Sequence, residues 1–342
     1  MKSEVQRVKI GVIGTGTMGK LHLDAWSKMN SINIVGIFGR EKEAVNELSE
    51  TYKSKSFTDF DELLNSDVDL IDICLPTYLH KEYVTKAAQK GKHIICEKPL
   101  ALDQDECREV LEICQKCNVQ LFVGHTLRFS QEYKQAHDQI TKGLIGKPGV
   151  VRLSRGGPFP QGRNSWYHDE AKSGGVILDL GIHDFDWVRW TFGEVERVFA
   201  KQVNRMGQNG NPIEYALVTL RMQSGTIVHI ELSWAQKGFT SAYEIAGNSG
   251  MIVHNYQESN PIKLSLVDDG VQNSIDVAVP ETIGAKTPIQ LQLEHFMKCI
   301  ENDEQPLVTA EDAMNAVKIA VAAIDSVRSG QPVSLLTKKE VF

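Results

Sequence analysis

Hydrophobic positions in the first 125 residues follow two alternating periods. Short, mostly apolar runs predict buried strands at residues 8–13, 32–38, 67–75, 93–96 and 119–123. The segments between these runs have helical patterns and predict helices at residues 18–29, 41–52, 82–89 and 103–117. Such an alternation of strands and helices is typical of a parallel sheet with helices on both faces.

The second half of the chain has a different pattern. A strand-like run at residues 149–154 and a helical stretch at 174–192 come first, and two helical stretches at 290–301 and 310–328 come last. Between them, short turns rich in Gly, Asn, Asp and Ser separate pairs of strand-like runs, a pattern that predicts antiparallel hairpins. The predicted pairs are 215–222 with 226–232, 242–246 with 251–254, and 263–267 with 274–279.

These patterns predict an α/β protein with two domains. A length of 342 residues exceeds what one hydrophobic core usually supports. We expect a first domain at residues 1–125 and a second, α+β domain at residues 126–342, built on a large, mainly antiparallel open sheet. The junction is expected near residues 124–130, and the last helix is expected to pack back on the first domain or on the sheet.

The turn after the first strand carries a GxGxxG motif, made of Gly14, Thr15, Gly16, Thr17, Met18 and Gly19. Glycines in this pattern allow a tight turn and a close approach of the backbone to a diphosphate, and the amides that open the next helix point at the phosphates. The motif alone is weak evidence, but here it lies between a strand and a helix, as a dinucleotide site requires. The first domain is therefore expected to be a Rossmann dinucleotide-binding domain.

The end of the second strand indicates which nicotinamide cofactor is bound. A carboxylate about 20 residues after the motif normally binds the ribose 2′-hydroxyl of NAD. Gly39 and Arg40 occupy this place, which leaves room for a 2′-phosphate and offers a guanidinium to bind it. The sequence therefore favours NADP over NAD. In the alternative interpretation Arg40 is a solvated surface cation, and Glu41 reaches the ribose instead.

Composition narrows the class of protein. The chain has 37 Lys and Arg against 44 Asp and Glu, and this net charge of −7 argues against nucleic-acid binding, which depends on cations. No apolar window of about 18 residues predicts a membrane span, and the N-terminus has no apolar signal core. Six cysteines are too few for a disulfide scaffold. We therefore expect a soluble, cytoplasmic protein with reduced thiols.

Two further segments carry groups suited to acid–base chemistry. Lys98 directly follows the fourth strand, and ligands of open parallel sheets bind at the carboxyl ends of the strands. If residues 174–192 form one helix, Asp179 and His183 share a face, where the carboxylate would orient an imidazole that takes a hydroxyl proton. Solvated surface residues are the simpler alternative for both segments. We expect no metal, because a site of Asp179, His183 and Asp186 would lack a further soft or imidazole ligand nearby.

Other side chains are candidates for binding the substrate. His125 and Arg128 follow the last strand of the first domain and are expected to point into the cleft between the domains, with a structural role as the alternative for Arg128. Polyol sites commonly combine aromatic walls with polar tips, although core packing also explains buried aromatic residues. The candidates for such walls are Trp166, Tyr167, His168 and Trp234.

Taken together, these residues resemble the glucose-fructose oxidoreductase / inositol 2-dehydrogenase family, often written Gfo/Idh/MocA. The resemblance covers nearly the whole chain and rests on the segments GVIGTGTMG, ICLPTYLH, HIICEKPLA, VGHTLRF and GGVILDLGIHDFDWVRW. It implies a Rossmann domain and a C-terminal domain whose open sheet often mediates homodimers or homotetramers. It also implies NAD(P)-dependent hydride transfer to or from a secondary hydroxyl of a sugar, inositol or related polyol.

The resemblance also implies roles for residues. The family's catalytic lysine, aspartate and histidine fall on Lys98, Asp179 and His183. In the mechanism implied, His183 takes the hydroxyl proton, Lys98 binds the same oxygen, and Asp179 orients His183. The residues implied to lie along the cofactor are Leu75, Pro76, Thr77, His80, Glu97 and Lys98.

Two other functions are compatible with the sequence. Some relatives in this family keep the cofactor tightly bound and use it transiently, to cleave a glycosidic bond or to interconvert two sugars. A noncatalytic, cofactor-sensing protein is the other alternative, and the retention of Lys98 and His183 argues against it.

Overall fold

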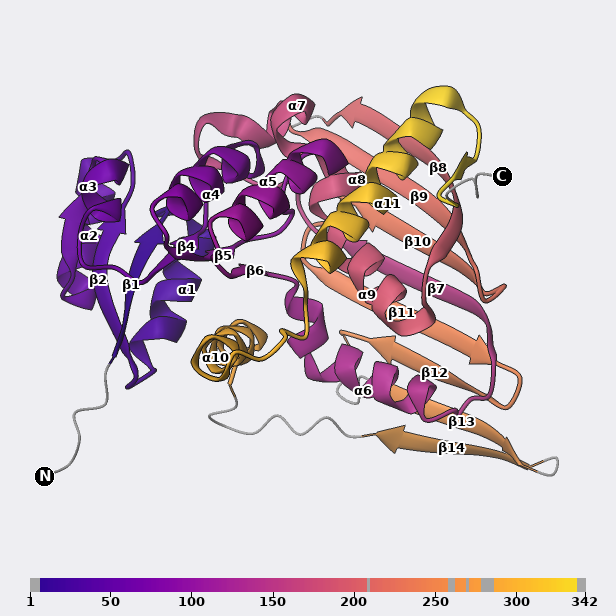
Figure 1. The fold of residues 1–342 in the computed structure, drawn as a ribbon. Helices are drawn as coiled ribbons and strands as arrows, with labels where there is room; N and C mark the ends of the chain where they lie inside the picture. The colour runs from indigo at the N-terminus through magenta and orange to yellow at the C-terminus, as the bar shows by residue number, and fades with distance from the viewer. Residues whose placement is uncertain (1–6, 208–209, 258–261, 269–270, 278–285, 337–342) are drawn as a thin grey trace, which may run out of the picture. The chain divides into compact units, whose positions relative to one another are not determined.

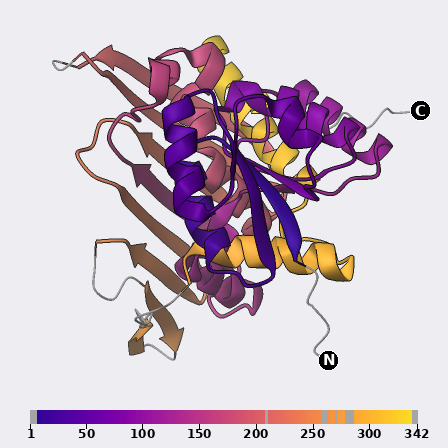
Figure 2. The same ribbon diagram turned by 90° about the vertical axis from the view of Figure 1, so that its left-hand side faces the viewer.

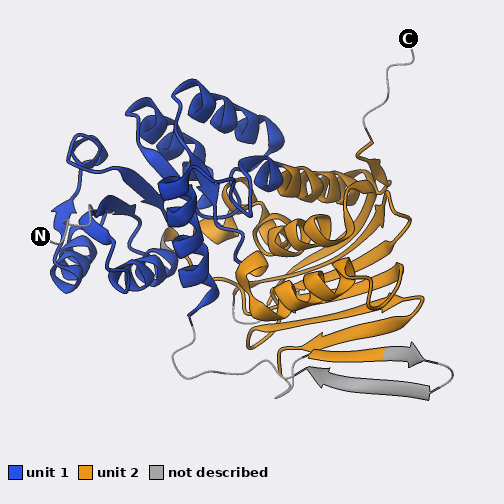
Figure 3. Cartoon of the chain, turned by 60° about the horizontal axis from the view of Figure 1, so that its bottom comes forward, with its two compact units in different colours: residues 1–126, 286–314 blue, residues 127–285, 315–342 orange. Residues whose placement is uncertain are grey.

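The computed structural model describes residues 7–207, 210–257, 262–268, 271–277 and 286–336. The chain divides into two compact units, residues 1–126 with 286–314 and residues 127–285 with 315–342 (Figure 3). Each unit has a sheet of its own.

The first unit is built on a six-stranded parallel sheet with the order β3-β2-β1-β4-β5-β6, which is typical of a doubly wound dinucleotide-binding fold. The bounds are β1 (Val8–Ile13), β2 (Ile32–Phe38), β3 (Lys55–Phe57), β4 (Leu70–Ile73), β5 (His93–Cys96) and β6 (Leu121–Val123). The five predicted strands and their parallel pairing are confirmed. The sequence pattern did not reveal β3, because this strand is short and mostly exposed.

Helices cover both faces of this sheet, so strand residues such as Ile10, Ile71 and Ile94 are fully buried. In Figure 1, α1 and α10 lie on one face, and α4 and α5 lie on the other. Phe296 of α10 stacks on Phe122 of β6 with ring centroids 5.0 Å apart, which joins a late segment of the chain to this unit. The bounds are α1 (Thr17–Ser27), α2 (Lys42–Tyr52), α3 (Phe60–Leu64), η1 (Thr77–Leu79), α4 (His80–Gln89), α5 (Gln104–Lys116) and α10 (Pro288–Asn302).

The second unit is built on a nine-stranded sheet with the order β14-β13-β12-β11-β7-β10-β9-β8-β15. The pair β7–β10 is parallel, and the other neighbours are antiparallel. The bounds are β7 (Pro148–Gly156), β8 (Val195–Met206), β9 (Pro212–Met222), β10 (Ile227–Ser233), β11 (Thr240–Gly247), β12 (Gly250–Asn255), β13 (Ile262–Asp268), β14 (Val271–Val277) and β15 (Val333–Ser334). The three predicted hairpins are confirmed as β9–β10, β11–β12 and β13–β14. Residues 269–270 and 278–279 of the last predicted hairpin lie outside the described residues.

The helices of this unit lie on one face of its sheet (Figures 1 and 2). Strand β9 shows the consequence, because Val218 and Leu220 face the core and are fully buried, whereas Tyr215 and Leu217 on the opposite face are exposed. The bounds are η2 (Thr126–Phe129), α6 (Gln131–Thr141), η3 (Arg163–His168), α7 (Glu170–Ser173), α8 (Gly175–Asp179), α9 (Ile182–Phe192) and α11 (Ala310–Ser329).

Candidate active site

The glycine motif forms the turn between β1 and α1. Gly14 has a φ of +108°, and a Cβ atom there would lie 2.2 Å from the carbonyl oxygen of Cys74. A Cβ atom on Gly19 would lie 1.9 Å from the carbonyl oxygen of Gly14. Backbone packing therefore requires glycine at both positions.

Gly16 has a different environment. No described heavy atom lies within 4 Å of the position its Cβ would take, and Gly16 is the N-cap of α1. No side chain caps this helix, and no acidic residue stands in its first turn. Helix amides without side-chain partners, next to an open backbone surface, fit the diphosphate of a dinucleotide. The remaining motif residues are buried Thr15, exposed Thr17 and half-buried Met18.

Gly39 stands next to this turn. A Cβ atom there would lie 2.9 Å from Cγ2 of Thr15 and 3.0 Å from Cγ2 of Val45, so close packing explains this glycine without reference to the cofactor. Arg40 and Glu41 follow it and are both exposed. The preference for NADP therefore stays a prediction.

Strand register gathers three predicted segments at one edge of the sheet. Ile13 of β1 pairs with Ile73 of β4, and Ile73 pairs with Cys96 of β5. The segments that follow these strands therefore share the carboxyl edge where open parallel sheets bind ligands. These segments contain the glycine motif, the half-buried Leu75 and Pro76 with the buried Thr77, and the pair Glu97 and Lys98.

His80 ties two of these segments together. Its Nδ1 lies 2.7 Å from the carbonyl oxygen of Pro99, and its Nε2 lies 2.7 Å from the carbonyl oxygen of Leu75. Burial lowers the pKa of His80, and the two carbonyl oxygens act in the opposite direction. Because the side chain is fully buried, it holds the two turns together, and a direct contact with the cofactor stays a prediction.

The turn after β5 contains Glu97, the half-buried Lys98 and Pro99, with a cis peptide bond between the last two. The Glu97 carboxylate is buried, and its Oε1 lies 3.1 Å from Nε2 of His22. Its contact with the nicotinamide ribose stays a prediction.

Sequence reasoning missed the partner of Glu97, which belongs to a buried network. Nδ1 of His22 lies 2.9 Å and 3.1 Å from the two carboxylate oxygens of Asp72, and Nε1 of Trp26 donates to Asp72 at 2.6 Å. The available signal was Asp72 itself, a carboxylate in the middle of the apolar run DVDLIDICL.

Among the described residues, His22, Asp72 and Cys74 form one group with the spacing of metal ligands, since their ligand atoms lie within 4.8 Å of one another. Burial raises the pKa of the Cys74 thiol to about 12, so the thiolate that a metal requires is disfavoured. The Asp72 oxygens already accept hydrogen bonds. The group is therefore a hydrogen-bonded network.

The second unit corrects the prediction of one helix over residues 174–192. Asp179 is the last residue of α8, and His183 is the second residue of α9. The amide of Gly181 donates to the carbonyl of Val176, five residues back, instead of to the residue four back. The prediction that Asp179 and His183 lie on one continuous helix is therefore wrong.

Glycines stand at or beside both ends of α8. Gly174 and Gly175 have positive φ angles of 72° and 65°, which end the preceding turn. A Cβ atom on Gly181 would lie 2.5 Å from the carbonyl oxygen of Ile177 and 2.7 Å from Cδ1 of Leu232. Close packing therefore explains the glycine at position 181.

Two buried ion pairs anchor α9, the helix that carries His183. Asp184 accepts from Nε and Nη2 of Arg155 at 2.7 Å and 2.9 Å. Asp186 accepts from Nε and Nη2 of Arg128 at 2.9 Å and 2.6 Å. The structural alternative for Arg128 gains support from this pair, and its contact with substrate stays a prediction.

A further carboxylate near Asp179 was missed. Glu214 of β9 accepts a hydrogen bond from the amide of Val176 at 2.8 Å and so caps α8. Burial raises the pKa of Glu214, the Val176 amide lowers it, and the neighbouring Glu170 and Asp179 raise it further.

The predicted aromatic residues form one cluster. Trp234, which is 4% exposed, makes edge contacts with Tyr167 and with Phe159, at ring-centroid distances of 6.0 Å and 5.3 Å. Trp166 contacts Tyr167 at 3.9 Å, and His168 contacts Phe159 at 4.8 Å.

The predicted site residues are divided between the units. Lys98 and the buried His125 belong to the first unit, and Asp179 and His183 belong to the second. Asp179 is 8% exposed, and His183 is half-buried. The convergence of Lys98 and His183 on one hydroxyl stays a prediction.

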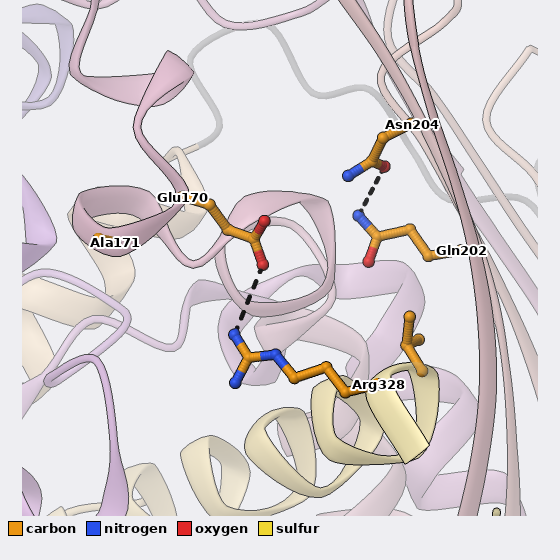
Figure 4. A pocket seen from close by; sticks show the side chains of 6 residues that line it. Glu170, Ala171, Gln202, Asn204 and Arg328 are labelled. Atoms are coloured by element: carbon orange, nitrogen blue, oxygen red, sulfur yellow. Dashed lines mark hydrogen bonds and ion pairs between the residues drawn. The ribbon is translucent and has the colours of Figure 1, made fainter. Parts of the chain in front are cut away.

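A pocket of about 520 Å³ lies in the second unit, and none of the predicted site residues lines it (Figure 4). Its lining includes the ion pair of Arg328 with Glu170, at 3.8 Å, and the hydrogen bond between Gln202 and Asn204, at 2.8 Å.

Comparison with known families gives two matches. Residues 8–125 match an oxidoreductase family with an NAD-binding Rossmann fold, and residues 137–335 match the C-terminal alpha/beta domain of the same oxidoreductase family. No helix in the described part of the chain has the length and hydrophobicity that a membrane span needs.

Individual relatives cover almost the entire chain. An uncharacterized oxidoreductase, YrbE, of Bacillus subtilis is 30% identical over 96% of this chain and 97% of its own. A myo-inositol 2-dehydrogenase of Thermotoga maritima is 30% identical over 96% of this chain and 98% of its own. The crystal structure of a probable dehydrogenase from Thermotoga maritima superposes with a TM-score of 0.80 at 29% identity, covering 96% and 99% of the two chains.

Proposed function

Because the chain belongs to the Gfo/Idh/MocA family of NAD-binding oxidoreductases, we propose that it transfers hydride between a nicotinamide dinucleotide and a secondary hydroxyl or ketone of a sugar, inositol or related polyol. The observation that carries the proposal is the shared sheet edge, where the glycine turn suited to a diphosphate and the turn with Lys98 follow neighbouring strands.

In this proposal His183 and Lys98 act on the substrate, and Asp179 acts on His183. The nicotinamide, when bound, accepts or supplies the hydride. His183 takes the proton of the hydroxyl when the alcohol is oxidised and returns it in the reverse reaction. Lys98 donates a hydrogen bond to the same oxygen and stabilises its developing negative charge. Asp179 orients the His183 ring and favours its charged form.

The names of relatives and the residue types in the predicted site support the substrate class. Relatives at comparable coverage are named myo-inositol 2-dehydrogenase, scyllo-inositol 2-dehydrogenase and D-apiose dehydrogenase. The cluster of Trp166, Tyr167, His168 and Trp234 offers the combination of apolar walls and polar tips that binds polyols. The exposed Arg40 beside Gly39 supports NADP as the preferred cofactor.

The proposal includes a homodimer or homotetramer formed through the second sheet. Its uncovered face carries exposed apolar side chains on neighbouring strands β8 and β9, including Val203, Ile213, Tyr215 and Leu217. Patches of this kind are typical of protein interfaces. The six free cysteines support a reducing, cytoplasmic location.

The test is a panel of inositols, aldoses and keto sugars assayed with NAD and NADP by the absorbance of the reduced nicotinamide. A lasting change with a polyol supports net oxidation or reduction, and products without net cofactor turnover would contradict it. His183→Asn should lower kcat by about 10²- to 10⁴-fold, the range of general acid–base catalysis, while still binding cofactor. Near-normal turnover in that variant would remove His183 from its assigned role.

A further inference from the structure

Two buried histidines hold the turn that carries Lys98, one on each side of it. On the side before Lys98, His22 of α1 lies 3.1 Å from the carboxylate of Glu97. On the side after Lys98, His80 lies 2.7 Å from the carbonyl oxygen of Pro99. Both histidine side chains are fully buried.

Two carboxylates flank the His22 ring and favour its charged form. Its Nδ1 faces the carboxylate of Asp72 and its Nε2 faces the carboxylate of Glu97, and an ionised carboxylate can only accept hydrogen bonds. An imidazolium, with a proton on each nitrogen, donates to both partners at once. The Trp26 indole also donates to the Asp72 carboxylate, at 2.6 Å.

The other titratable groups around His22 agree with this charge. Cys74 lies beside Asp72, and burial raises the pKa of both Cys74 and Cys96, so these thiols stay neutral. Burial lowers the pKa of His22, but the interactions with Asp72 and Cys74 together outweigh this effect, and the net direction is well above the usual range.

The glycine at position 124 leaves room for the Glu97 carboxylate beside His22. A Cβ atom on Gly124 of the neighbouring chain segment would lie 2.5 Å from Oε1 of Glu97, so a larger residue there would displace the carboxylate. The amide of Glu97 donates to the carbonyl of Ile73 at 3.0 Å, which holds the backbone as well.

We propose that His22 and His80 are positioning residues that clamp Glu97 and Pro99 and thereby direct the side chain of Lys98 between them. The inference rests on the catalytic role proposed for Lys98. Neither histidine touches the reacting atoms in this scheme. Each acts through a neighbour of Lys98, so their loss should matter only while the lysine is present.

A double-mutant cycle tests this dependence. His22→Gln and His80→Gln each keep one amide donor group but cannot reach both partners of the original ring, which lie on opposite sides of it. Each should lower kcat by about 10- to 100-fold, the cost of a misplaced catalytic group. In the Lys98→Met background the same changes should have almost no further effect. His93→Gln, at the opposite end of β5, is the matched control and should leave kcat unchanged.

A second measurement follows Lys98 itself in the cofactor-free protein. The rate at which a lysine-acylating reagent modifies Lys98, read by mass spectrometry of its peptide, should change in His22→Gln and stay at the wild-type value in His93→Gln. Equal fold losses of kcat in both backgrounds, or an unchanged acylation rate, would overturn the clamp. Full activity of Lys98→Met alone would overturn the proposed function instead.

If His22→Gln fails to fold, the wild-type protein still gives an answer. Nitrogen NMR of isotope-labelled histidine, with His22 assigned through its contacts to the Trp26 indole, should show both ring nitrogens protonated at neutral pH. A neutral His22 ring would overturn the bridge between the two carboxylates.

Discussion

Asp184, the residue directly after His183, is held by a two-point ion pair with the buried Arg155. Removing one partner leaves a buried charge without compensation, so Arg155→Met should lower the free energy of unfolding by about 3–5 kcal/mol. The double variant Arg155→Met with Asp184→Leu should recover part of this loss. Urea unfolding of the three proteins checks the prediction, and a loss that is equal in the single and double variants would contradict it.

Gly16→Ala should separate cofactor binding from folding. Gly16 has extended backbone angles, and nothing described lies near its Cβ position, so the melting temperature without cofactor should not change. A methyl group there would meet the diphosphate, and the Kd for dinucleotide should rise by at least about 10-fold, or 1.4 kcal/mol. Gly19→Ala is the contrasting variant, because its methyl group meets the Gly14 carbonyl and should destabilise the fold itself. Unchanged affinity in Gly16→Ala would argue against this turn as the diphosphate site.

Arg40→Ala tests the cofactor preference. A charge-assisted hydrogen bond to a 2′-phosphate contributes about 1.5–3 kcal/mol, so kcat/KM with NADP should fall by at least about 10-fold while the value with NAD stays nearly constant. Lys42→Ala, which removes another exposed cation two residues away, should leave both values unchanged. A wild-type preference for NAD would show that Arg40 is a solvated surface residue.

Glu214→Gln should change how stability depends on pH. Burial raises the pKa of Glu214 in the folded state, so its contribution to stability is fully present below the unfolded pKa of about 4.5 and is lost as pH rises through the folded pKa. The free energy of unfolding of the neutral variant minus that of the wild type should therefore be larger at pH 7 than at pH 4.5. Thermal unfolding at several pH values measures this difference, and a difference that moves the other way would be inconsistent with the raised pKa.

Leu217→Lys tests the uncovered face of the second sheet. If protomers associate there, a buried lysine at this position of β9 should shift the protein to a smaller species in light scattering. Leu144→Lys is a matched control, because Leu144 and Leu217 are similarly exposed, at 42% and 44%. A particle size that responds equally to both changes, or to neither, would place the interface elsewhere.

Local patterns in the sequence predicted those parts of the fold that depend on neighbouring residues. The strands around Ile13, Ile73 and Cys96 are mostly apolar runs, and the hairpins have turn residues between alternating strands. The glycine motif was informative for the same reason, because its strand and its helix flank it directly.

Features that depend on distant partners could not be predicted in this way. His22 meets Asp72 and Glu97, which are 50 and 75 residues away, and Arg128 meets Asp186 across 58 residues. The break after Asp179 was missed because the helical pattern of apolar positions over residues 174–192 continues through it. A buried polar residue can be matched to a distant partner only when the arrangement of the helices and strands is known.

The first unit is discontinuous in sequence, and this affects the order in which a newly made chain can mature. Residues 286–314 leave the ribosome after strands β7 to β14 of the second sheet, and only then can Phe296 of this late segment stack on Phe122. The nucleotide-binding half is thus translated first and completed nearly last. Until residues 286–314 are made, Phe122 lacks the ring that stacks on it in the folded protein. Apolar surface that stays exposed during synthesis favours aggregation and chaperone binding.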